Sequence, residues 1–161
     1  MKTALIFISK HGTTEKVAQD IANKLGKEQT ELINLKNNSS PNLEAYDRII
    51  LGGSIHVGAI QKKMRRFYEK NTDQLLSKKL GLFLCCMDKE KAQEEFDRAY
   101  PETLRNHSTS NEILGGEFRI DKMNSLERFM TKKIAGVTES VSEIREDKIN
   151  KFVGALKKAI Q

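Results

Sequence analysis

The chain has 161 residues, of which 38% are hydrophobic and 31% are charged, and its formal net charge is +6 at pH 7. This length is typical of one domain with a buried core, while the absence of a long apolar stretch or a signal-like N-terminus excludes the membrane-spanning and exported classes. We therefore expect a cytoplasmic protein with acidic partners, but the scattered lysines and missing aromatic–basic pattern do not support nucleic-acid binding.

Five segments have the composition of β-strands, and three of them are nearly continuous apolar runs. Such runs are typical of parallel strands that helices cover on both faces. The predicted strands are residues 3–8, 31–35, 48–52, 80–86 and 112–120.

The segments between these strands predict helices, because apolar residues recur every three or four positions. Residues 37–46 are too short and too polar for a further helix. The apolar stripes are Val17, Ile21 and Leu25; Ile60, Met64 and Phe67 with Tyr68 alongside; Ala92, Phe96, Ala99 and Tyr100, broken at Pro101; and Ile149, Phe152, Val153, Leu156 and Ile160.

Strands and helices alternate, which predicts an α/β fold with a parallel sheet and helices on both faces. We expect residues 1–161 to form one domain. One segment breaks the alternation: residues 121–146 lie between the last strand and the last helix and are long for a connection in a compact domain. We call this segment the 121–146 insertion, and its length indicates either function or disorder.

The loop after the first strand has the sequence Ser9-Lys10-His11-Gly12-Thr13-Thr14 and leads into the first helix. Free N–H groups at a helix N-terminus, hydroxyl donors and a glycine that permits a tight turn suit a phosphate group. The Walker A and G-x-G-x-x-G patterns are absent, which disfavours nucleoside triphosphates and dinucleotides. The alternative is structural, with Thr13 or Thr14 serving only as the helix N-cap.

Three further strand ends carry small or polar residues: "GGSIHVG" at 52–58, "CCMDKE" at 85–90, and Gly115-Gly116. Ligands of open α/β sheets bind beyond the carboxyl ends of the strands, so these segments are predicted to meet at one crevice. Ordinary strand-to-helix turns are the alternative. Adjacent Cys85 and Cys86 do not suit a disulfide or a zinc site, and at least one is interpreted as a small buried core residue.

At these residues the chain resembles the flavodoxin family, and the resemblance covers nearly the whole sequence. It implies a doubly wound five-stranded parallel sheet of order 2-1-3-4-5 that binds FMN. The positions that match the phosphate loop are Ser9, Lys10, His11, Gly12, Thr13 and Thr14; those that match the ring loops are Ser54, Ile55, His56, Val57 and Gly58, and Cys85, Cys86, Met87 and Asp88, with Gly115 and Gly116 at the neighbouring strand end.

The segments "YDRIILGGSIHVG" (46–58) and "LERFMTKKIAG" (126–136) are similar to the menaquinone-dependent protoporphyrinogen dehydrogenases, which also carry an insertion before the last helix. This resemblance implies an FMN oxidoreductase of haem synthesis that takes hydride from a planar acidic tetrapyrrole and reduces a quinone. We assign no side chain as catalytic acid or base and none as a metal ligand.

Residues 124–135 predict a helix with Leu126, Phe129, Met130 and Ile134 on one side and Arg128, Lys132 and Lys133 elsewhere. This pattern fits peripheral contact with anionic lipid at the inner face of the cell membrane, or with an acidic substrate. The alternative is an ordinary core helix that covers the sheet edge.

Two other functions agree with the same residues. One is a flavodoxin that shuttles electrons between redox partner proteins, and the other is a flavodoxin-fold protein that has lost its flavin. The chain lacks tryptophan, and its expected ring loops contain one aromatic side chain, His56. Stacked aromatic pairs contribute about 0.5–1.5 kcal/mol beyond burial, so the missing rings predict weaker flavin binding than in ordinary flavodoxins.

Overall fold

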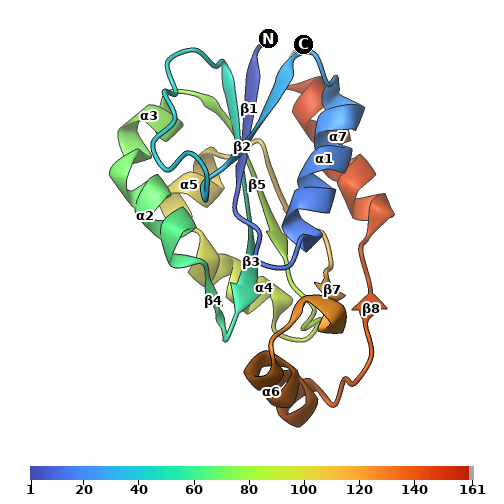
Figure 1. Cartoon of the computed structure of the whole chain (residues 1–161). Coiled ribbons are helices and arrows are strands. Elements are labelled where there is room, and N and C mark those ends of the chain that lie inside the picture. Colours follow the sequence, from blue (N-terminus) through green and yellow to red (C-terminus); the bar gives the residue numbers. More distant parts are fainter. Residues whose placement is uncertain (160–161) are drawn as a thin grey trace.

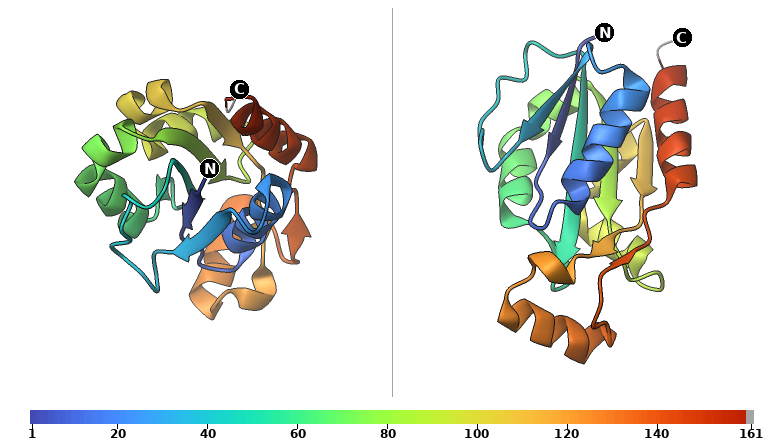
Figure 2. Two further views of the ribbon diagram at one scale, coloured as in Figure 1. Left: turned by 90° about the horizontal axis from the view of Figure 1, so that it is seen from above. Right: turned by 45° about the vertical axis from the view of Figure 1, so that its right-hand side comes forward.

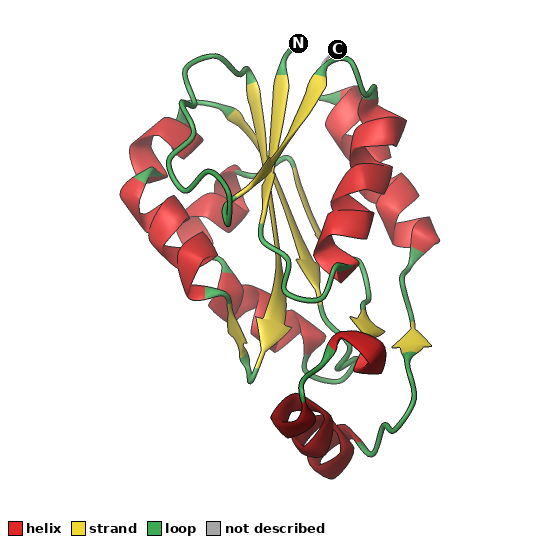
Figure 3. Ribbon diagram, in the orientation of Figure 1, coloured by secondary structure: helices red, strands yellow, loops and turns green. Residues whose placement is uncertain are grey.

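In the computed structural model, which describes residues 1–159, a twisted parallel sheet lies between two layers of helices (Figures 1 and 3). Phe7 on the first strand pairs with Asn34 of the second strand on one side and with Gly52 of the third strand on the other. The strand order is β2-β1-β3-β5-β6, with every neighbouring pair parallel, which confirms the predicted doubly wound order. The strands are β1 (Thr3–Phe7), β2 (Thr30–Asn34), β3 (Arg48–His56), β5 (Lys79–Cys85) and β6 (Ser110–Ile113).

Helices cover both faces of the sheet because successive strand residues point to opposite sides (Figure 2). Leu5, Ile50 and Phe83 pack toward α1 (Thr13–Leu25) and α7 (Glu146–Lys158). The alternate strand residues pack against the other layer, and every strand residue in these two clusters is buried. That layer contains α2 (Lys62–Lys70), α3 (Thr72–Leu76), α4 (Ala92–Ala99) and α5 (Glu102–His107). Ile160 of the predicted C-terminal stripe lies outside the described residues.

The third strand differs from the prediction in its length. β3 continues to His56 rather than ending at residue 52, and it folds back as a hairpin onto β4 (Ala59–Ile60). Ile60 therefore lies in β4, and the predicted helix begins only at Lys62. The Gln61 side chain joins the two strands, because it accepts from the Ser54 N–H at 3.0 Å and donates to the Ser54 hydroxyl at 2.7 Å.

The single strand predicted at 112–120 is wrong, since the chain forms β6 and then a separate β7 (Glu117–Phe118). Gly115 separates them with φ = +73°, and a Cβ atom there would lie 1.9 Å from the carbonyl oxygen of Glu143. Only glycine fits this close approach of the returning chain. β7 pairs antiparallel with β8 (Val141–Ser142) instead of extending the main sheet.

The 121–146 insertion projects beyond the carboxyl edge of the sheet, on the opposite side from the N-terminus (Figure 2). It begins within a short 3₁₀ helix, η1 (Ile120–Lys122), and contains α6 (Ser125–Ala135), which starts with a capping box between Asn124 and Glu127. No residue of α6 is buried, so the alternative of an ordinary core helix is wrong. Within residues 1–159, none of the helices has the length and apolarity needed to cross a membrane.

Candidate functional site

A cavity of about 690 Å³ lies at the carboxyl edge of the sheet, between the strand-end loops and the 121–146 insertion. Loops that follow β1, β3 and β5 form one side, and α6 with the segment after it forms the other. The sequence-predicted residues that line the cavity are Ser9, Lys10, His11, Thr13, Thr14, Ser54, Ile55, His56, Val57, Gly58, Cys85, Cys86, Met87, Asp88 and Gly116.

Gly12 and Gly115 are the predicted site residues that do not line the cavity. Gly12 is the N-cap of α1 with φ = +96°, and its carbonyl accepts the N–H of Lys16. Gly115 lies behind the wall, where its carbonyl accepts the N–H of Cys86 at 2.9 Å. Both glycines shape the backbone of the loops that line the cavity.

The 9–14 loop presents free hydrogen-bond donors at the N-terminus of α1. Neither Thr13 nor Thr14 caps the helix, so the N-cap alternative is wrong; both lie in its first turn. Within residues 1–159, the backbone N–H groups of Thr13, Thr14 and Glu15 have no acceptor. Free N–H groups at the positive end of a helix dipole form an anion-binding site.

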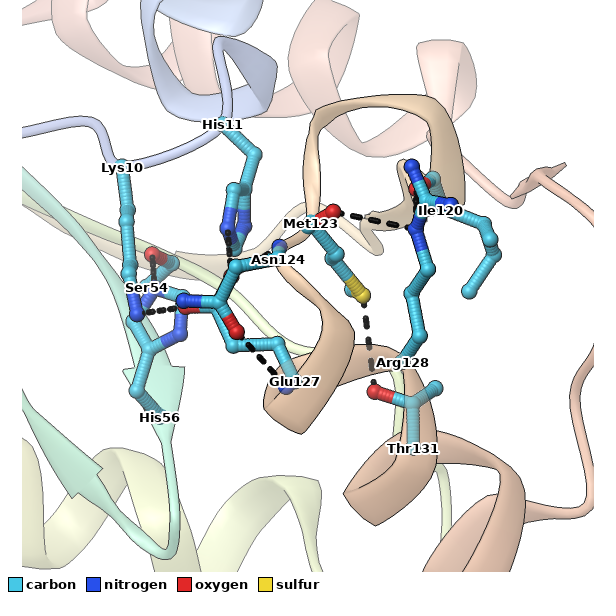
Figure 4. Close-up of polar contacts among 10 residues, drawn as sticks. All are labelled: Lys10, His11, Ser54, His56, Ile120, Met123, Asn124, Glu127, Arg128 and Thr131. Atoms are coloured by element: carbon cyan, nitrogen blue, oxygen red, sulfur yellow. Dashed lines mark hydrogen bonds and ion pairs between the residues drawn. The ribbon is translucent and has the colours of Figure 1, made fainter.

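Two carboxylates contact this loop from the C-terminal part of the chain. Glu127 of α6 forms ion pairs with Lys10 and with His11, the latter at 3.3 Å (Figure 4). The hydrogen bond from Lys10 is the largest cause that lowers the pKa of Glu127 to about 2, and the Asn124 backbone N–H is the next. The carboxylate is therefore charged at neutral pH.

The second carboxylate, Glu117, accepts from the hydroxyl of Thr13 at 3.2 Å and from Lys16 at 2.9 Å. It also accepts from the Ser142 hydroxyl, which lies in the returning strand β8. Burial acts to raise the pKa of Glu117, but the hydrogen bonds from Lys16, Ser142 and Thr13 outweigh burial and lower it. The ammonium group of Lys16 neutralises the charge of Glu117, so this carboxylate does not repel an anion that binds at the N-terminus of α1.

The β3–β4 hairpin forms the wall near His56, whose Nε2 lies 3.0 Å from the Ser54 hydroxyl. Burial, followed by the positive charges of His11 and Lys10, lowers the pKa of His56 to about 4. The His11 and His56 rings meet edge to face with centroids 5.8 Å apart. Two imidazole rings therefore border the cavity on the side of the 9–14 loop, and that of His56 is neutral at pH 7.

The tip of this hairpin is strained and fully exposed. Val57 is 99% exposed and has φ = +51°, a conformation that β-branched residues rarely adopt. Gly58 follows with φ = +71°. Positive φ at both central residues is the signature of a two-residue hairpin turn in which asparagine and glycine are the usual residues. Backbone strain of this kind is typical of ligand-binding segments.

The floor of the cavity contains two buried thiols. Burial is the main cause that raises the pKa of both Cys85 and Cys86 to about 12, so both remain protonated and poorly nucleophilic. The Cys86 thiol donates to the buried carboxylate of Glu95 at 2.8 Å. Both cysteines are thus buried, as predicted for a core residue, and both also line the cavity.

Several lining residues escaped the sequence analysis. Glu95, Glu117 and Phe118 carried no motif, and their position depends on the break at Gly115 and on the fold of α4. The insertion supplies Met123, Glu127, Met130, Thr131 and Ile134. The sequence analysis places Met130 and Ile134 on one side of the predicted helix, but it assigns that side to lipid or substrate contact and not to the wall of the cavity.

An anion-binding helix terminus beside an apolar cleft, at the point where the strand order reverses between β1 and β3, defines a flavodoxin-like α/β protein. The chain belongs to the flavodoxin domain family, whose model matches residues 4–144.

Comparison with known proteins agrees with this family. The chain is 25% identical over 156 residues to a protoporphyrinogen IX dehydrogenase [quinone] of Escherichia coli K12, covering 91% of this chain and 86% of that protein. A short-chain flavodoxin associated with a non-canonical PDU bacterial microcompartment has the same fold, with a TM-score of 0.62 and 16% identity over 100% of both chains. A Fusobacterium nucleatum flavodoxin bound to flavin mononucleotide has a TM-score of 0.59 and 15% identity over 99% of both chains.

Proposed function

We propose that this protein is an FMN-dependent oxidoreductase of the protoporphyrinogen dehydrogenase type, that residues 1–161 form one flavodoxin-like domain, and that a quinone accepts the electrons. The observation that carries this proposal is the cavity, where an anion-binding loop adjoins an apolar cleft closed by the insertion. Membership of the flavodoxin domain family and 25% identity to the E. coli enzyme support it.

The residues of the 9–14 loop suit the phosphate of FMN. Three backbone N–H groups without acceptors, those of Thr13, Thr14 and Glu15, lie at the positive end of α1. The Thr14 hydroxyl, the Lys10 ammonium group and the His11 imidazole also line the cavity. These groups would hold the phosphate through charge-assisted hydrogen bonds.

The rest of the cavity suits the flat ring. Ile55, His56 and Met87 would flank it, and the wall also includes Phe118. FMN supplies hydride and electron transfer when it is bound, while the protein supplies binding, orientation and electrostatics. The thiols of the floor stay protonated, and His56 stays neutral at pH 7.

The insertion supports a planar, apolar and acidic substrate. Its side chains Met123, Met130 and Ile134 give the cavity an apolar wall opposite the strand-end loops. The 690 Å³ volume lies within the range of about 300–1,000 Å³ found for ligand pockets. The net charge of +6 favours carboxylate-bearing molecules. We propose that α6 also makes peripheral contact with the inner face of the cell membrane.

Isosteric substitution of Thr14 tests the phosphate position. Thr14→Val removes one hydroxyl donor, and a hydrogen bond to a charged group contributes roughly 1.5–3 kcal/mol, so the Kd for FMN should rise roughly 10- to 100-fold. Riboflavin lacks the phosphate, and its Kd should stay unchanged. Quenching of flavin fluorescence measures both.

The control is Thr3→Val, a buried threonine at the opposite end of β1, which should leave both affinities unchanged. Equal FMN affinity of T14V and wild type would contradict the phosphate position.

Turnover tests the reaction. FMN-loaded protein is mixed with protoporphyrinogen and a menaquinone analogue, and formation of the fluorescent porphyrin is followed. Turnover supports the dehydrogenase. Its absence, together with rapid reduction of the flavin by a flavodoxin reductase, would assign the protein to the electron carriers instead.

A further inference from the structure

One side chain holds α6 to the body of the domain. Among residues 1–159, the hydrogen bonds and ion pairs that join residues 124–136 to residues 1–118 or 143–159 all involve Glu127 (Figure 4). The other polar contacts of this segment stay local: Arg128 donates to the carbonyls of Ile120 and Met123, and Thr131 donates to the Met123 sulfur.

Apolar packing adds little to this attachment. No residue of α6 is buried, and Leu126, Phe129 and Ile134 are 69%, 60% and 73% exposed. A helix of 11 residues is marginally stable in water without tertiary contacts. The order of α6 therefore depends on the ion pairs of Glu127 with Lys10 and His11, which we call the α6 latch.

The cations of the α6 latch belong to the 9–14 loop, which is also the anion-binding loop. A phosphate monoester carries about −1.5 to −2 charges at pH 7 and three acceptor oxygens, whereas Glu127 offers one negative charge. The phosphate also gains the free N–H groups of Thr13, Thr14 and Glu15. Two anions beside the same cations repel each other, and the phosphate is the stronger competitor.

We infer that Glu127 is an electrostatic latch that competes with the phosphate of FMN for Lys10 and His11, so that flavin binding loosens α6 from the 9–14 loop and lets this wall of the cavity open and close. This inference rests on the proposed function for its ligand. The apolar and basic side chains of α6 are already exposed, and release frees the helix that carries them to move relative to the strand-end loops when the protein holds its cofactor. Flavin loading thereby regulates the surface through which the protein meets its substrate or a membrane.

Limited trypsin digestion measures the release, because Lys132 and Lys133 are exposed cleavage sites in α6 that become susceptible when the helix unfolds. FMN should accelerate cleavage at these sites severalfold in the wild type, and riboflavin should not. Glu127→Gln should be cleaved faster than the wild type without any ligand, and FMN should add no further acceleration. Glutamine retains the capping box, so this variant removes the charge and keeps the helix start.

Binding affinity separates competition from simple loosening. Loss of the competing carboxylate should let E127Q bind FMN about three- to fivefold more tightly. Lys10→Gln should also accelerate cleavage at Lys132 and Lys133, but it should weaken FMN binding because the cation itself is lost. The matched control is Glu139→Gln, an exposed residue of the same insertion, which should change neither quantity.

Three results would overturn the latch: cleavage of ligand-free E127Q at the wild-type rate, protection of α6 by FMN in the wild type, or FMN binding that leaves the cleavage rate of the wild type unchanged. A protein that shows no FMN binding in the fluorescence titration would overturn the proposed function together with the coupling. The titration distinguishes that outcome from failure of the latch, in which FMN binds but cleavage does not respond.

Discussion

His56 combines a titratable ring with a position where its charged form is disfavoured. Burial and the nearby cations lower its pKa to about 4, whereas the unfolded chain has the ordinary value of 6.5. Between these two values the unfolded state binds more protons than the folded state, so the unfolding free energy rises with pH through this window. Above pH 6.5 the His56 ring is neutral in both the folded and the unfolded state, so it no longer changes the unfolding free energy as the pH rises.

We predict that His56→Gln removes this pH dependence. The difference of 2.5 units (6.5 minus 4) corresponds to at most about 3 kcal/mol between pH 4 and pH 6.5. Urea denaturation of the flavin-free protein at pH 4.5 and 7.5, followed by circular dichroism, measures the difference from wild type.

His107→Gln removes an exposed imidazole far from the cavity and serves as the control. The pH-dependent difference should be confined to H56Q. If the unfolding free energies of H56Q and wild type changed by the same amount between pH 4.5 and 7.5, the prediction that protonation of His56 destabilises the folded state would be wrong.

At the scale of elements, α6 has an unusual surface for a helix outside a core. Its exposed Leu126, Phe129 and Ile134 lie beside the cations Lys132 and Lys133. An amphipathic helix with basic residues is typical of proteins that bind at a lipid surface. The start of the helix is well defined, because Asn124 and Glu127 satisfy each other's backbone N–H groups.

Charge removal on α6 tests the membrane contact. Each lysine near an anionic surface contributes about 1 kcal/mol, so Lys132→Gln with Lys133→Gln should weaken binding to phosphatidylglycerol vesicles roughly 30-fold. Co-sedimentation of the FMN-loaded protein measures the partition.

The control is Lys157→Gln with Lys158→Gln, a lysine pair in the last turn of α7 at the other end of the molecule. It should leave vesicle binding unchanged. Equal losses for both pairs would indicate a general effect of net charge, and no loss for the α6 pair would contradict the membrane contact.

For the whole molecule, the apolar runs of the sequence predicted the parallel strands and the helix layers, because each buried strand needs cover on both faces. The order of the strands was predicted only from the resemblance to the flavodoxin family. The hairpin after Gly53 escaped prediction because its turn residues are Val57 and Gly58, and valine is not a usual residue at a position that requires positive φ. The split of the last strand depends on the approach of Glu143 to Gly115, which only the folded chain brings together.

The candidate site divides in the same way. Segments that directly follow β1, β3 and β5 were predictable, since topology places every such loop at one edge of a parallel sheet. The partnership of Glu127 with Lys10 and His11 joins residues more than 100 positions apart, and no local pattern marks it. Long-range ion pairs depend on how the insertion folds back, which periodicity does not encode.

Residues 119–140, which contain α6, begin and end at neighbouring positions, because Phe118 of β7 lies opposite Val141 of β8. A two-residue Asn-Gly turn can bridge such neighbours, so replacing residues 119–140 with Asn-Gly should leave a shorter chain that unfolds cooperatively and still binds FMN. Thermal denaturation and flavin titration measure this. Vesicle binding should be lost, and an aggregated product would show that the segment is integral to folding.

Such a junction makes the segment exchangeable. Inserting or deleting this segment between neighbouring backbone positions would add or remove the helix that covers the cavity, without any change to the sheet. Proteins of this architecture can then differ in the segment inserted between β7 and β8 while they keep the same sheet and helix layers.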